Sequence, residues 1–480
     1  MSDIVRSQRP SVWLAAGVIE RLERAVTRAL HRARATGSGA YVSIGAPLER
    51  PADPAAIVAA SRRPDEPWFC LEQPDRDGSA LAALGCLVAL EARGLARFAE
   101  IARRWRALAA GAFTDPRTGP PGSGLVALGG FAFAPDGGAS PRWSGFAPAS
   151  LVVPEVSFAR RRSETWITLN ALVAPDDTVE DVLARVQRRL QELRSEALPL
   201  LDPAPTGRYE VVSPMPPAHY EQAVGRAVER IRAGELQKVV LAREVEVHAP
   251  ADHDPAAVLG LLREEFPSCL VFAVGRGDAT FVAASPELLV RREGQRVSTV
   301  ALAGSIRRSA DPAVDDHLGE QLLRSEKDRE ENTIVARRIT RALRPHAVWV
   351  TAAEEPVLVK VANIQHLAAP IRAQLASSIG AIELAGLLHP TPAVGAEPAS
   401  AALDVIPALE GLDRGWYAGP VGWSDDGGDG EFCVALRCAL LRGRTATCYA
   451  GGGIVRDSDP AAELAETELK LQAMLPALAG

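Results

Sequence analysis

The chain has 480 residues, 47% of them hydrophobic, and a formal net charge of −7 with an isoelectric point near 5.8. Its lysines and arginines are scattered and do not form a stripe, which argues against nucleic acid as a main partner. The six cysteines form no C-x-x-C pair and the eight histidines show no H-x-x-x-H spacing, which argues against a disulfide scaffold and a zinc site.

No apolar run is long enough to span a bilayer, since Val12–Ile19 is short and charged residues follow it directly. The sparse cysteines fit a reduced compartment. We therefore expect a cytoplasmic protein with no membrane partner, large enough to bury one large core or two ordinary ones.

The first 205 residues mix helices and strands and show no pattern typical of a catalytic site. Apolar periodicity predicts helices over 19–34 and 181–198 and strands over 68–72, 125–132 and 165–173. A cluster of prolines between 203 and 217 marks an internal boundary. We expect a variable N-terminal part, residues 1–205, packed into the same fold as a catalytic domain, residues 206–480.

Beyond residue 216 the pattern is richer in strands. It predicts helices over 219–233, 255–265, 315–343, 378–388 and 400–406, and strands over 237–247, 419–423, 431–441 and 445–455, with four more between 268 and 302 and others near 356–371. Strands interspersed with helices, without strict βαβ alternation, are typical of an α+β domain. The predicted fold class is α+β, with large, mainly antiparallel sheets flanked by helices.

Lys238 lies in the predicted strand over 237–247, where period-2 alternation places it on one face with Val240 and Ala242. Desolvation in an enclosed site disfavours an ammonium group, which would make this lysine a usable general base. A lysine that guards an edge strand is the commoner explanation of the same pattern.

Two other polar residues occupy positions where burial would give them a function. Glu287 follows Ser285 and Pro286 in a turn between two predicted strands. It is either a surface acid or a carboxylic acid directed into a cleft, where it could donate a proton. Arg437 lies inside the predicted strand over 431–441, so we expect it to have a carboxylate partner from the protein or from a ligand.

Two pairs of carboxylates occur at helical spacing. Asp328 and Glu331 lie at i and i+3, and Glu463 and Glu466 repeat that spacing near the end of the chain. Carboxylates on two helices, with no Cys or His at ligand spacing, suit a hard cation such as Mg²⁺. Solvated, charged helix faces are the alternative interpretation.

The second acid pair follows a glycine turn. Gly451–Gly453 end a predicted strand, and three consecutive glycines let backbone N–H groups approach a ligand. Lys470 lies at i+7 from Glu463, so the helix presents two carboxylates and an ammonium on one face.

Together these segments resemble the chorismate-utilising enzymes, which include isochorismate synthase, salicylate synthase, anthranilate synthase component I and aminodeoxychorismate synthase. The matching stretches, in the family's order, are LQKVVLAR (236–243), ASPELLV (284–290), LAGS (302–305), SEKDREEN (325–332), NIQHL (363–367), HPTPAVGA (389–396), WYAGPVGW (416–423), GEFCVALR (430–437) and YAGGGIV with AAELAETELK (449–470). They span nearly all of residues 216–475, whereas the N-terminal part is similar only in a general way.

The resemblance implies chorismate as the substrate, Mg²⁺ as the cofactor and a role for each matching position. Lys238 corresponds to the base that activates water for attack at ring C2, and Glu287 to the acid that protonates the departing C4 hydroxyl. Glu331 and Glu466 correspond to magnesium ligands, with Asp328 and Glu463 close by through water. The implied substrate-binding positions are Ala303, Gly304, His366, Tyr417, Leu436, Arg437, Gly451, Gly452, Gly453 and Lys470.

Within the family, the sequence is most similar to the isochorismate synthases of the menaquinone type. Lysine at 238 fits the branches that add water, because the ammonia-using enzymes carry glutamine there. Ala303 stands where aminodeoxychorismate synthase has a nucleophilic lysine. Two departures from the usual pattern, Ser305 for threonine and Ala396 for glycine, remove no catalytic group.

Several alternatives stay open at this point. Salicylate synthase shares the lysine base and then eliminates pyruvate, and Tyr417 with Leu436 resembles its pocket as well. A non-catalytic homologue or an ammonia-using subunit is disfavoured, because the expected acids, base and cationic anchors are all present. Menaquinone and siderophore routes both begin from isochorismate, and we expect a monomer or a weak homodimer.

Overall fold

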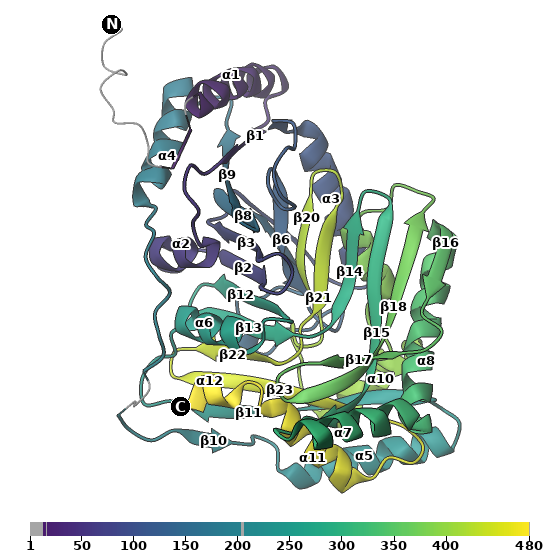
Figure 1. Ribbon diagram of the computed structural model, residues 1–480. Coiled ribbons are helices and arrows are strands. Elements are labelled where there is room, and N and C mark those ends of the chain that lie inside the picture. The colour runs from purple at the N-terminus through teal and green to yellow at the C-terminus, as the bar shows by residue number, and fades with distance from the viewer. Residues whose placement is uncertain (1–12, 16, 203–205, 480) are drawn as a thin grey trace, which may run out of the picture.

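In the computed structural model, residues 13–15, 17–202 and 206–479 are described, and they form two large β-sheets surrounded by helices (Figure 1). The predicted apolar run over 12–19 lies partly outside the described residues. Among those described, no helix has the length and apolar character needed to cross a membrane.

The larger sheet has thirteen strands in the described part of the chain. In spatial order they are β10 (Glu210–Val212), β11 (Lys238–His248), β23 (Thr445–Ile454), β22 (Cys438–Arg442), β13 (Ala279–Ser285), β12 (Leu270–Arg276), β2 (Trp68–Gln73), β3 (Ser79–Leu84), β8 (Val156–Arg161), β9 (Glu164–Val173), β1 (Ala40–Pro47) and β5 (Phe113–Thr114), with β19 (Ala396–Glu397) paired to β11. Neighbouring strands pair antiparallel, except that β1 and β5 are parallel.

The smaller sheet has ten strands, all antiparallel, over the same described ranges. Their order is β16 (Ala347–Ala352), β18 (Ile364–Leu375), β15 (Arg296–Arg307), β14 (Leu288–Glu293), β21 (Gly430–Val434), β20 (Pro420–Asp425), β6 (Val126–Phe131), β7 (Ala149–Val153) and β4 (Val88–Ala92), with β17 (Val357–Lys360) paired to β18. Both sheets contain strands from residues 1–205 and from residues 206–480, so the two parts of the chain share one architecture of the predicted α+β class.

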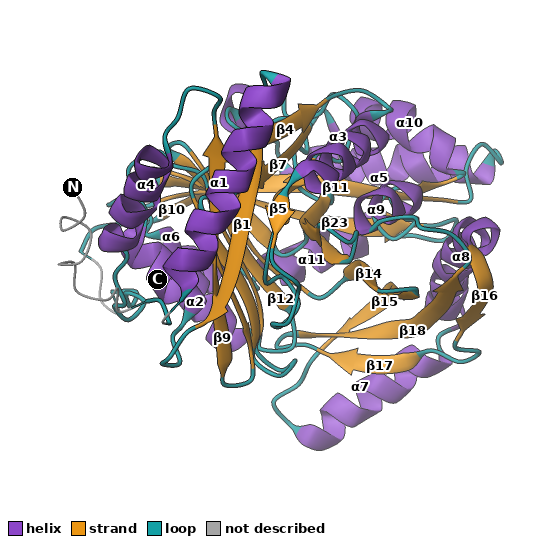
Figure 2. Cartoon of the chain, turned by 90° about the horizontal axis from the view of Figure 1, so that it is seen from above, coloured by secondary structure: helices purple, strands orange, loops and turns teal. Residues whose placement is uncertain are grey.

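Helices cover the outer faces of the sheets, as Figure 2 shows from above. They are α1 (Val18–Thr36), α2 (Pro54–Ser61), α3 (Arg97–Gly111), α4 (Val179–Glu192), α5 (Pro217–Arg232), α6 (Pro255–Glu265), α7 (Pro312–Arg324), α8 (Glu326–Leu343), α9 (Ala381–Leu388), α10 (Ala402–Glu410), α11 (Pro460–Leu471) and α12 (Leu475–Ala479), with 3₁₀ turns at η1 (Pro141–Trp143), η2 (Arg344–His346) and η3 (Ala399–Ala401). Helix α1 illustrates why they pack: Leu22, Val26 and Ala29 recur at helical spacing and are buried on one stripe.

Two apolar clusters form the core. One lies between the thirteen-stranded sheet and helices α1, α2, α4, α6 and α12, and includes Phe158 and Val271. The other joins the facing sheets and continues to α3, α8 and α9, and includes Phe131 and Phe281. Phe131 stacks on Phe98 of α3 with ring centroids 4.1 Å apart, which ties that helix to the smaller sheet.

The structure corrects several predicted boundaries. The single helix predicted over 315–343 is two helices, because Ser325 has extended backbone, ends α7 and caps α8 by accepting a hydrogen bond from the Asp328 N–H. The strand predicted over 431–441 is β21 and β22, which belong to different sheets. The helix predicted over 181–198 ends at Glu192, and β16 was not predicted.

The chain crosses between the two sheets at several points, and two of these crossings are adjacent. Glu287 lies in the first crossing, from β13 to β14, and Arg437 in the second, from β21 to β22. The backbones of these crossings are joined, because the Val434 N–H donates to the Glu287 carbonyl at 3.0 Å and the Ala284 N–H to the Arg437 carbonyl at 3.0 Å. This junction positions the candidate site.

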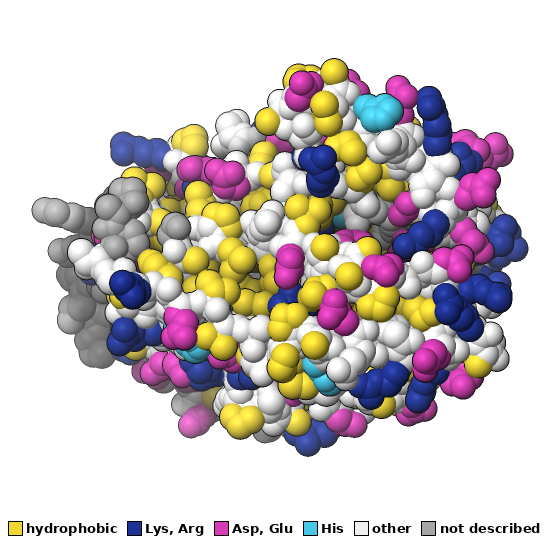
Figure 3. All heavy atoms as spheres, turned by 90° about the horizontal axis from the view of Figure 1, so that it is seen from below, with side chains coloured by type: hydrophobic (Ala, Val, Ile, Leu, Met, Phe, Trp, Pro, Cys, Tyr) yellow, Lys and Arg dark blue, Asp and Glu magenta, His cyan; other side chains and the backbone are white. Residues whose placement is uncertain are grey.

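Charges of both signs are interspersed over the lower face of the molecule, with hydrophobic side chains between them (Figure 3). Among the described residues on that face, no extended patch of one sign is present.

Candidate functional site

Lys238 is the first residue of β11 and is fully buried. Lys238 does not lie on an edge strand. Strand β19 pairs with β11 at Lys238, and β23 pairs with the other side of β11 from Val239 onward. Its Nζ donates a hydrogen bond to Glu331 Oε1 of α8 at 2.6 Å. The predicted base is therefore enclosed, and its head group is held by one of the predicted metal ligands.

Gly453 makes room for this ion pair. A Cβ atom at this position would lie 2.6 Å from Glu331 Oε1 and 3.1 Å from Lys238 Cε. Its neighbour Gly452 faces Tyr220 and Glu463, with a Cβ atom there lying 3.1 Å from each side-chain oxygen. The predicted glycine turn is wrong, because Gly451–Gly453 lie within β23 and pair with β11. In the strand, these glycines let two acids and a lysine approach the β23 backbone.

Glu287 is 3% exposed, so the structure decides between the two interpretations of this residue. Burial raises the pKa of its carboxyl from 4.5 to about 8, although Lys238 and Arg437 both act to lower it. A carboxyl with that pKa is mostly protonated at neutral pH, so it can donate a proton. Ser285 Oγ accepts from the Glu287 N–H at 3.2 Å and donates to the Val434 carbonyl at 2.6 Å, which fixes the turn.

The four predicted acids lie on α8 and α11 and influence one another electrostatically. Burial raises the pKa of Asp328, and the charges of Glu331 and Glu466 raise it further. Burial also raises the pKa of Glu463, again with a contribution from Glu466. Acids from two helices therefore share one region.

Each acid has its own partner in this arrangement. Ser305 Oγ donates to Glu466 Oε1 at 2.9 Å, and Lys470 Nζ lies 2.7 Å from the same oxygen. Burial opposes ionisation of Glu466, but Lys470 and Ser305 outweigh it and lower the pKa to about 2. Ser458 Oγ donates to Glu463 Oε1 at 2.7 Å.

As these side chains stand, no three His, Cys, Asp or Glu residues among those described form a group that could hold a metal ion. The chemistry of the four carboxylates nevertheless fits a hard cation, since all their donor atoms are oxygens. Glu463 Oε2 is buried and has no hydrogen-bond partner, so this acid has a coordination site to spare. Lys238 is hydrogen-bonded to Glu331 and Lys470 to Glu466, so these carboxylates would have to move to bind one ion together.

Cationic and aromatic groups surround the same region. Arg437 has φ +49° at the crossing and is buried, with its Nη2 3.4 Å from His366 Nε2. Burial and the nearby Arg437 and Lys470 charges lower the pKa of His366 to about 3, so the imidazole is neutral. Tyr417 stacks on Tyr449 with ring centroids 5.2 Å apart. Among the described residues, no carboxylate is in direct contact with the Arg437 guanidinium, which leaves this group for a ligand.

The remaining predicted positions line the same junction. Lys470 Nζ donates to the Gly451 carbonyl at 2.7 Å, and a Cβ atom at Gly451 would lie 2.9 Å from the Tyr417 hydroxyl. Gly304 has φ +80°, and a Cβ there would meet Asp328 Cβ at 2.9 Å. Ala303 is buried, and Leu436 is half-buried against the core.

Sequence reasoning missed a buried ion pair that supports β11. The Arg414 guanidinium donates to the Glu410 carboxylate, to the Val240 carbonyl at 2.9 Å and to the Val394 carbonyl at 2.8 Å. Glu410 in turn accepts a hydrogen bond from the Ala242 N–H of β11 at 2.7 Å. The i, i+4 spacing of Glu410 and Arg414 was the only local signal, and such spacing usually marks a surface pair.

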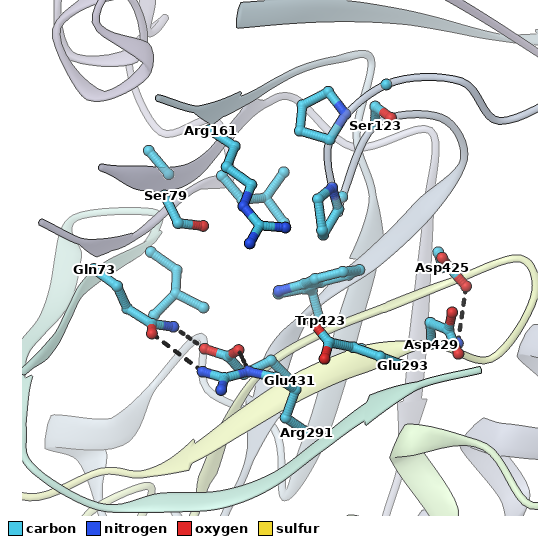
Figure 4. Close-up of a pocket in the computed structure, with 18 of the residues that line it drawn as sticks. Gln73, Ser79, Ser123, Arg161, Arg291, Glu293, Trp423, Asp425, Asp429 and Glu431 are labelled. Carbon is cyan, nitrogen blue, oxygen red and sulfur yellow. Dashed lines mark hydrogen bonds and ion pairs between the residues drawn. The ribbon is translucent and has the colours of Figure 1, made fainter. Parts of the chain in front are cut away.

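A separate cavity of about 350 Å³ lies between the sheets, and none of the predicted site residues lines it. Its polar groups contact one another: Arg76 donates to Glu431 at 2.8 Å, Arg291 donates to Gln73 at 3.1 Å, and Arg291 also pairs with Glu431. Figure 4 shows the contacts of Arg291 with Gln73 and Glu431 below Trp423, with Arg161 and Ser79 on the opposite wall.

Comparison with known proteins supports the resemblance seen in the sequence. The family described as chorismate binding enzyme matches residues 28–479, nearly the whole chain. The chain belongs to the chorismate-binding enzyme family.

Two curated members of the chorismate-binding family show how far the similarity extends. The salicylate biosynthesis isochorismate synthase of Pseudomonas aeruginosa is 39% identical over 451 residues, covering 94% of this chain and 93% of that protein. The isochorismate synthase MenF of Bacillus subtilis is 34% identical over 387 residues, covering 80% and 82%.

Solved structures of the chorismate-binding family have the same architecture. The menaquinone-specific isochorismate synthase MenF of Escherichia coli superposes with a TM-score of 0.75 at 26% identity, covering 95% of this chain and 100% of that one. Anthranilate synthase component I of Streptococcus pneumoniae, at 22% identity and a TM-score of 0.60, shares the fold over 72% of this chain and 80% of its own.

Proposed function

We propose that this enzyme is an isochorismate synthase, which converts chorismate to isochorismate by adding water at C2 and releasing the C4 hydroxyl. The observation that carries the proposal is that a lysine and a carboxylic acid, Lys238 and Glu287, are both buried and close enough to interact electrostatically. Glu287, with its pKa near 8, has a proton to give, and the Lys238 charge is close enough to act on that pKa. The family membership and the names of both curated relatives support the same reaction.

The reaction needs one base and one acid, and the two residues divide these roles. Lys238 must first lose one proton, to Glu331 or to solvent, because only a neutral amine can accept one. Its Nζ then accepts a proton from the water that attacks C2. The Glu287 carboxyl donates its proton to the C4 oxygen as that hydroxyl leaves. The proton balance closes, because one proton is taken up by the lysine and one is supplied by the acid.

Chorismate carries two carboxylates, so a junction that also contains four acids requires compensating positive charge. Arg437 and Lys470 supply part of it and hold substrate carboxylates. Glu331 and Glu466, with Asp328 and Glu463 close by, would hold Mg²⁺. The bound ion would supply the charge that anchors the ring carboxylate of the substrate.

Chelation tests the magnesium part of the proposal. Excess EDTA should abolish chorismate binding measured by calorimetry, not only turnover, and added Mg²⁺ should restore it. Unchanged substrate affinity in excess chelator would contradict a metal that anchors the substrate.

Product analysis tests the reaction itself. Chorismate, Mg²⁺ and enzyme are incubated and the products are separated by chromatography, with the Lys238→Ala variant in parallel. Isochorismate alone from the wild type, and none from the variant, supports the proposal. Salicylate with pyruvate would instead favour a salicylate synthase, while formation of anthranilate from added ammonia would favour the amine-transferring branch.

A further inference from the structure

Strand β11 carries Lys238, and among the described residues one of its two sides has no continuous partner strand. On that side β19 pairs with Lys238 and Val239, and β10 pairs with β11 from Glu246 to His248. The other side pairs with β23 from Val239 to His248. Lys238 is thus held by the short β19 pairing, and the backbone groups in the gap between β19 and β10 need other partners.

The buried ion pair of Glu410 and Arg414 bonds to β11 in this gap. The Arg414 guanidinium donates to the Val240 carbonyl at 2.9 Å, and Glu410 Oε1 accepts from the Ala242 N–H at 2.7 Å. In an antiparallel sheet a neighbouring strand would supply this donor and this acceptor from its own backbone. The two side chains therefore take the place of a short stretch of strand.

Arg414 also joins β11 to the loop that leads into β19. Its Nη1 donates to the Val394 carbonyl at 2.8 Å, and the next carbonyl, that of Gly395, accepts from the Val240 N–H at 2.7 Å. Strand β19 begins directly after this loop and pairs with Lys238. One guanidinium thus connects the two chain segments between which Lys238 is held.

The geometry of the pair explains why an arginine occupies position 414. Its Nε and Nη2 donate to the two Glu410 oxygens at 3.0 and 2.5 Å, while Nη1 and Nη2 also reach the two carbonyls. The side chains of Arg414 and Glu410 are 3% and 0% exposed, so water does not complete these bonds. A lysine has one compact ammonium group in place of this planar fork, and it cannot span the same partners.

We propose that Arg414 is a positioning residue for Lys238: with Glu410 it completes the hydrogen bonding of the first residues of β11 and so fixes where the lysine lies. Arg414 acts through the strand and not on the substrate. Stability alone does not explain the pair, because apolar residues can often replace a buried ion pair without loss of stability. The inference rests on the proposed function, in which Lys238 is the base.

Loss of the Arg414 fork should affect the chemical step more than substrate binding. The proposed substrate anchors Arg437 and Lys470 lie on other elements, at the β21–β22 crossing and on α11. Tyr417 lies under Arg414, with the guanidinium carbon 5.6 Å from its ring centroid. Its ring is also stacked on Tyr449, and its N–H donates to the Arg414 carbonyl, which any residue at this position supplies. We therefore expect kcat to fall while KM changes little.

Steady-state kinetics test this separation. Arg414→Lys keeps the charge but loses the fork, so kcat should fall about tenfold or more while the KM for chorismate stays within about threefold of wild type. Glu410→Gln retains an oxygen for the Ala242 N–H and should keep much more of the wild-type kcat than Glu410→Ala. Arg189→Lys is the matched control, because Arg189 is also buried and makes two hydrogen bonds to Glu66, at 2.8 and 2.9 Å, on helix α4.

Hydrogen exchange tests the support of β11 without measuring activity. In Glu410→Ala the Ala242 amide should exchange about tenfold faster or more than in the wild type. The amides of β22, which pairs with β13 and β23, should be unchanged. Unchanged protection of the Ala242 amide would overturn the inference even if turnover fell.

The kinetic outcomes separate this inference from the proposed function. A raised KM with unchanged kcat in Arg414→Lys, or an equal fall of kcat in Arg189→Lys at the same loss of melting temperature, would contradict a positioning role. If Arg414→Lys does not fold, equal kcat values for Glu410→Gln and Glu410→Ala would contradict it. A wild type that forms another product from chorismate would overturn the proposed function, and the same variants would then be compared on that product.

Discussion

Lys238 Nζ lies 2.6 Å from Glu331 Oε1, so the proposed base and a proposed metal ligand are held together by one ion pair, in which the lysine is fully buried and the glutamate partly. The same carboxylate cannot serve both partners fully. Lys238 therefore acts as an internal counter-ion for the acids on α8, and the metal and the lysine compete for Glu331.

Replacing Lys238 with Met should make Mg²⁺ bind more tightly while turnover is lost. The substitution keeps the length of the side chain and removes the competing charge, so we expect at least a tenfold gain in affinity, or about 1.4 kcal/mol. Calorimetric titration of Mg²⁺ without chorismate measures the effect. Lys360→Met serves as the control, because Lys360 pairs with Asp315 and Asp316 at the surface. Equal Mg²⁺ affinity in wild type and Lys238→Met would show that the ion pair does not oppose the metal.

Glu287→Gln should abolish turnover and change the pH dependence of stability. The folded-state pKa near 8 lies above the ordinary 4.5, so the folded enzyme binds more protons than the unfolded chain between these values. Wild-type stability is therefore favoured below pH 4.5 and is lost as pH rises through 8, by at most about 1.4 kcal/mol per pH unit. Glutamine does not titrate.

Thermal unfolding of the wild type and of Glu287→Gln, measured at pH 5 and at pH 8.5, tests whether the Glu287 carboxyl is protonated in the folded enzyme. The melting temperature of Glu287→Gln minus that of the wild type should be larger at pH 8.5. A difference that does not change with pH would mean that the Glu287 carboxyl is not held protonated. In the wild type, turnover should decline above about pH 8 as the donor ionises.

Arg437→Gln should raise the KM for chorismate with little effect on folding. Its guanidinium is buried. Among the described residues, His366 is the one charged or titratable side chain within hydrogen-bonding distance of it. Losing a buried, charge-assisted contact to a carboxylate costs about 2–5 kcal/mol, so we expect an increase of about 30-fold or more. Steady-state kinetics and circular dichroism check both parts. A normal KM would remove Arg437 from substrate binding.

Gly453→Ala should damage activity far more than stability. The new Cβ would lie 2.6 Å from Glu331 Oε1, so that flexible carboxylate must move away from Lys238. The backbone at Gly453 is not left-handed, so alanine fits it, and the free energy of unfolding should stay within about 1 kcal/mol of wild type. Gly225→Ala is the matched control, because a Cβ there meets nothing within 4 Å. Turnover of Gly453→Ala equal to that of Gly225→Ala would contradict a role for the Lys238–Glu331 geometry.

Local pattern predicted most elements, because helices such as α6 and strands such as β9 have strong periodicity and clear boundaries. Local pattern gave the wrong boundaries where contacts between residues distant in sequence determine where an element ends. The apolar run over 431–441 reads as one strand, yet the chain changes sheets at Arg437, which adopts φ +49° because β21 and β22 have different neighbours. The charged periodicity over 315–343 continues through Ser325, so the break between α7 and α8 was hidden.

In the candidate site too, the sequence identified individual residues but not the contacts between them. The family resemblance assigned roles to Lys238, Glu287 and Arg437, while alternation placed Lys238 on one face with Val240 and Ala242 but left an edge-strand lysine as the commoner explanation. Neither could show that Lys238 is paired with Glu331, which is 93 residues away in sequence. Whether Glu287 was a surface acid or a buried one also depended on how the two crossings meet. The metal-binding role of the four acids stays a prediction.

The measurement that tests the central account most directly is turnover of chorismate in H₂¹⁸O with Mg²⁺, followed by mass spectrometry of the product. If Lys238 activates water for attack at C2 while Glu287 releases the C4 hydroxyl, isochorismate should carry a single solvent-derived oxygen, located at C2. Isochorismate that contains no ¹⁸O would mean that the hydroxyl migrates within the substrate, and the division of roles between the two residues would be wrong.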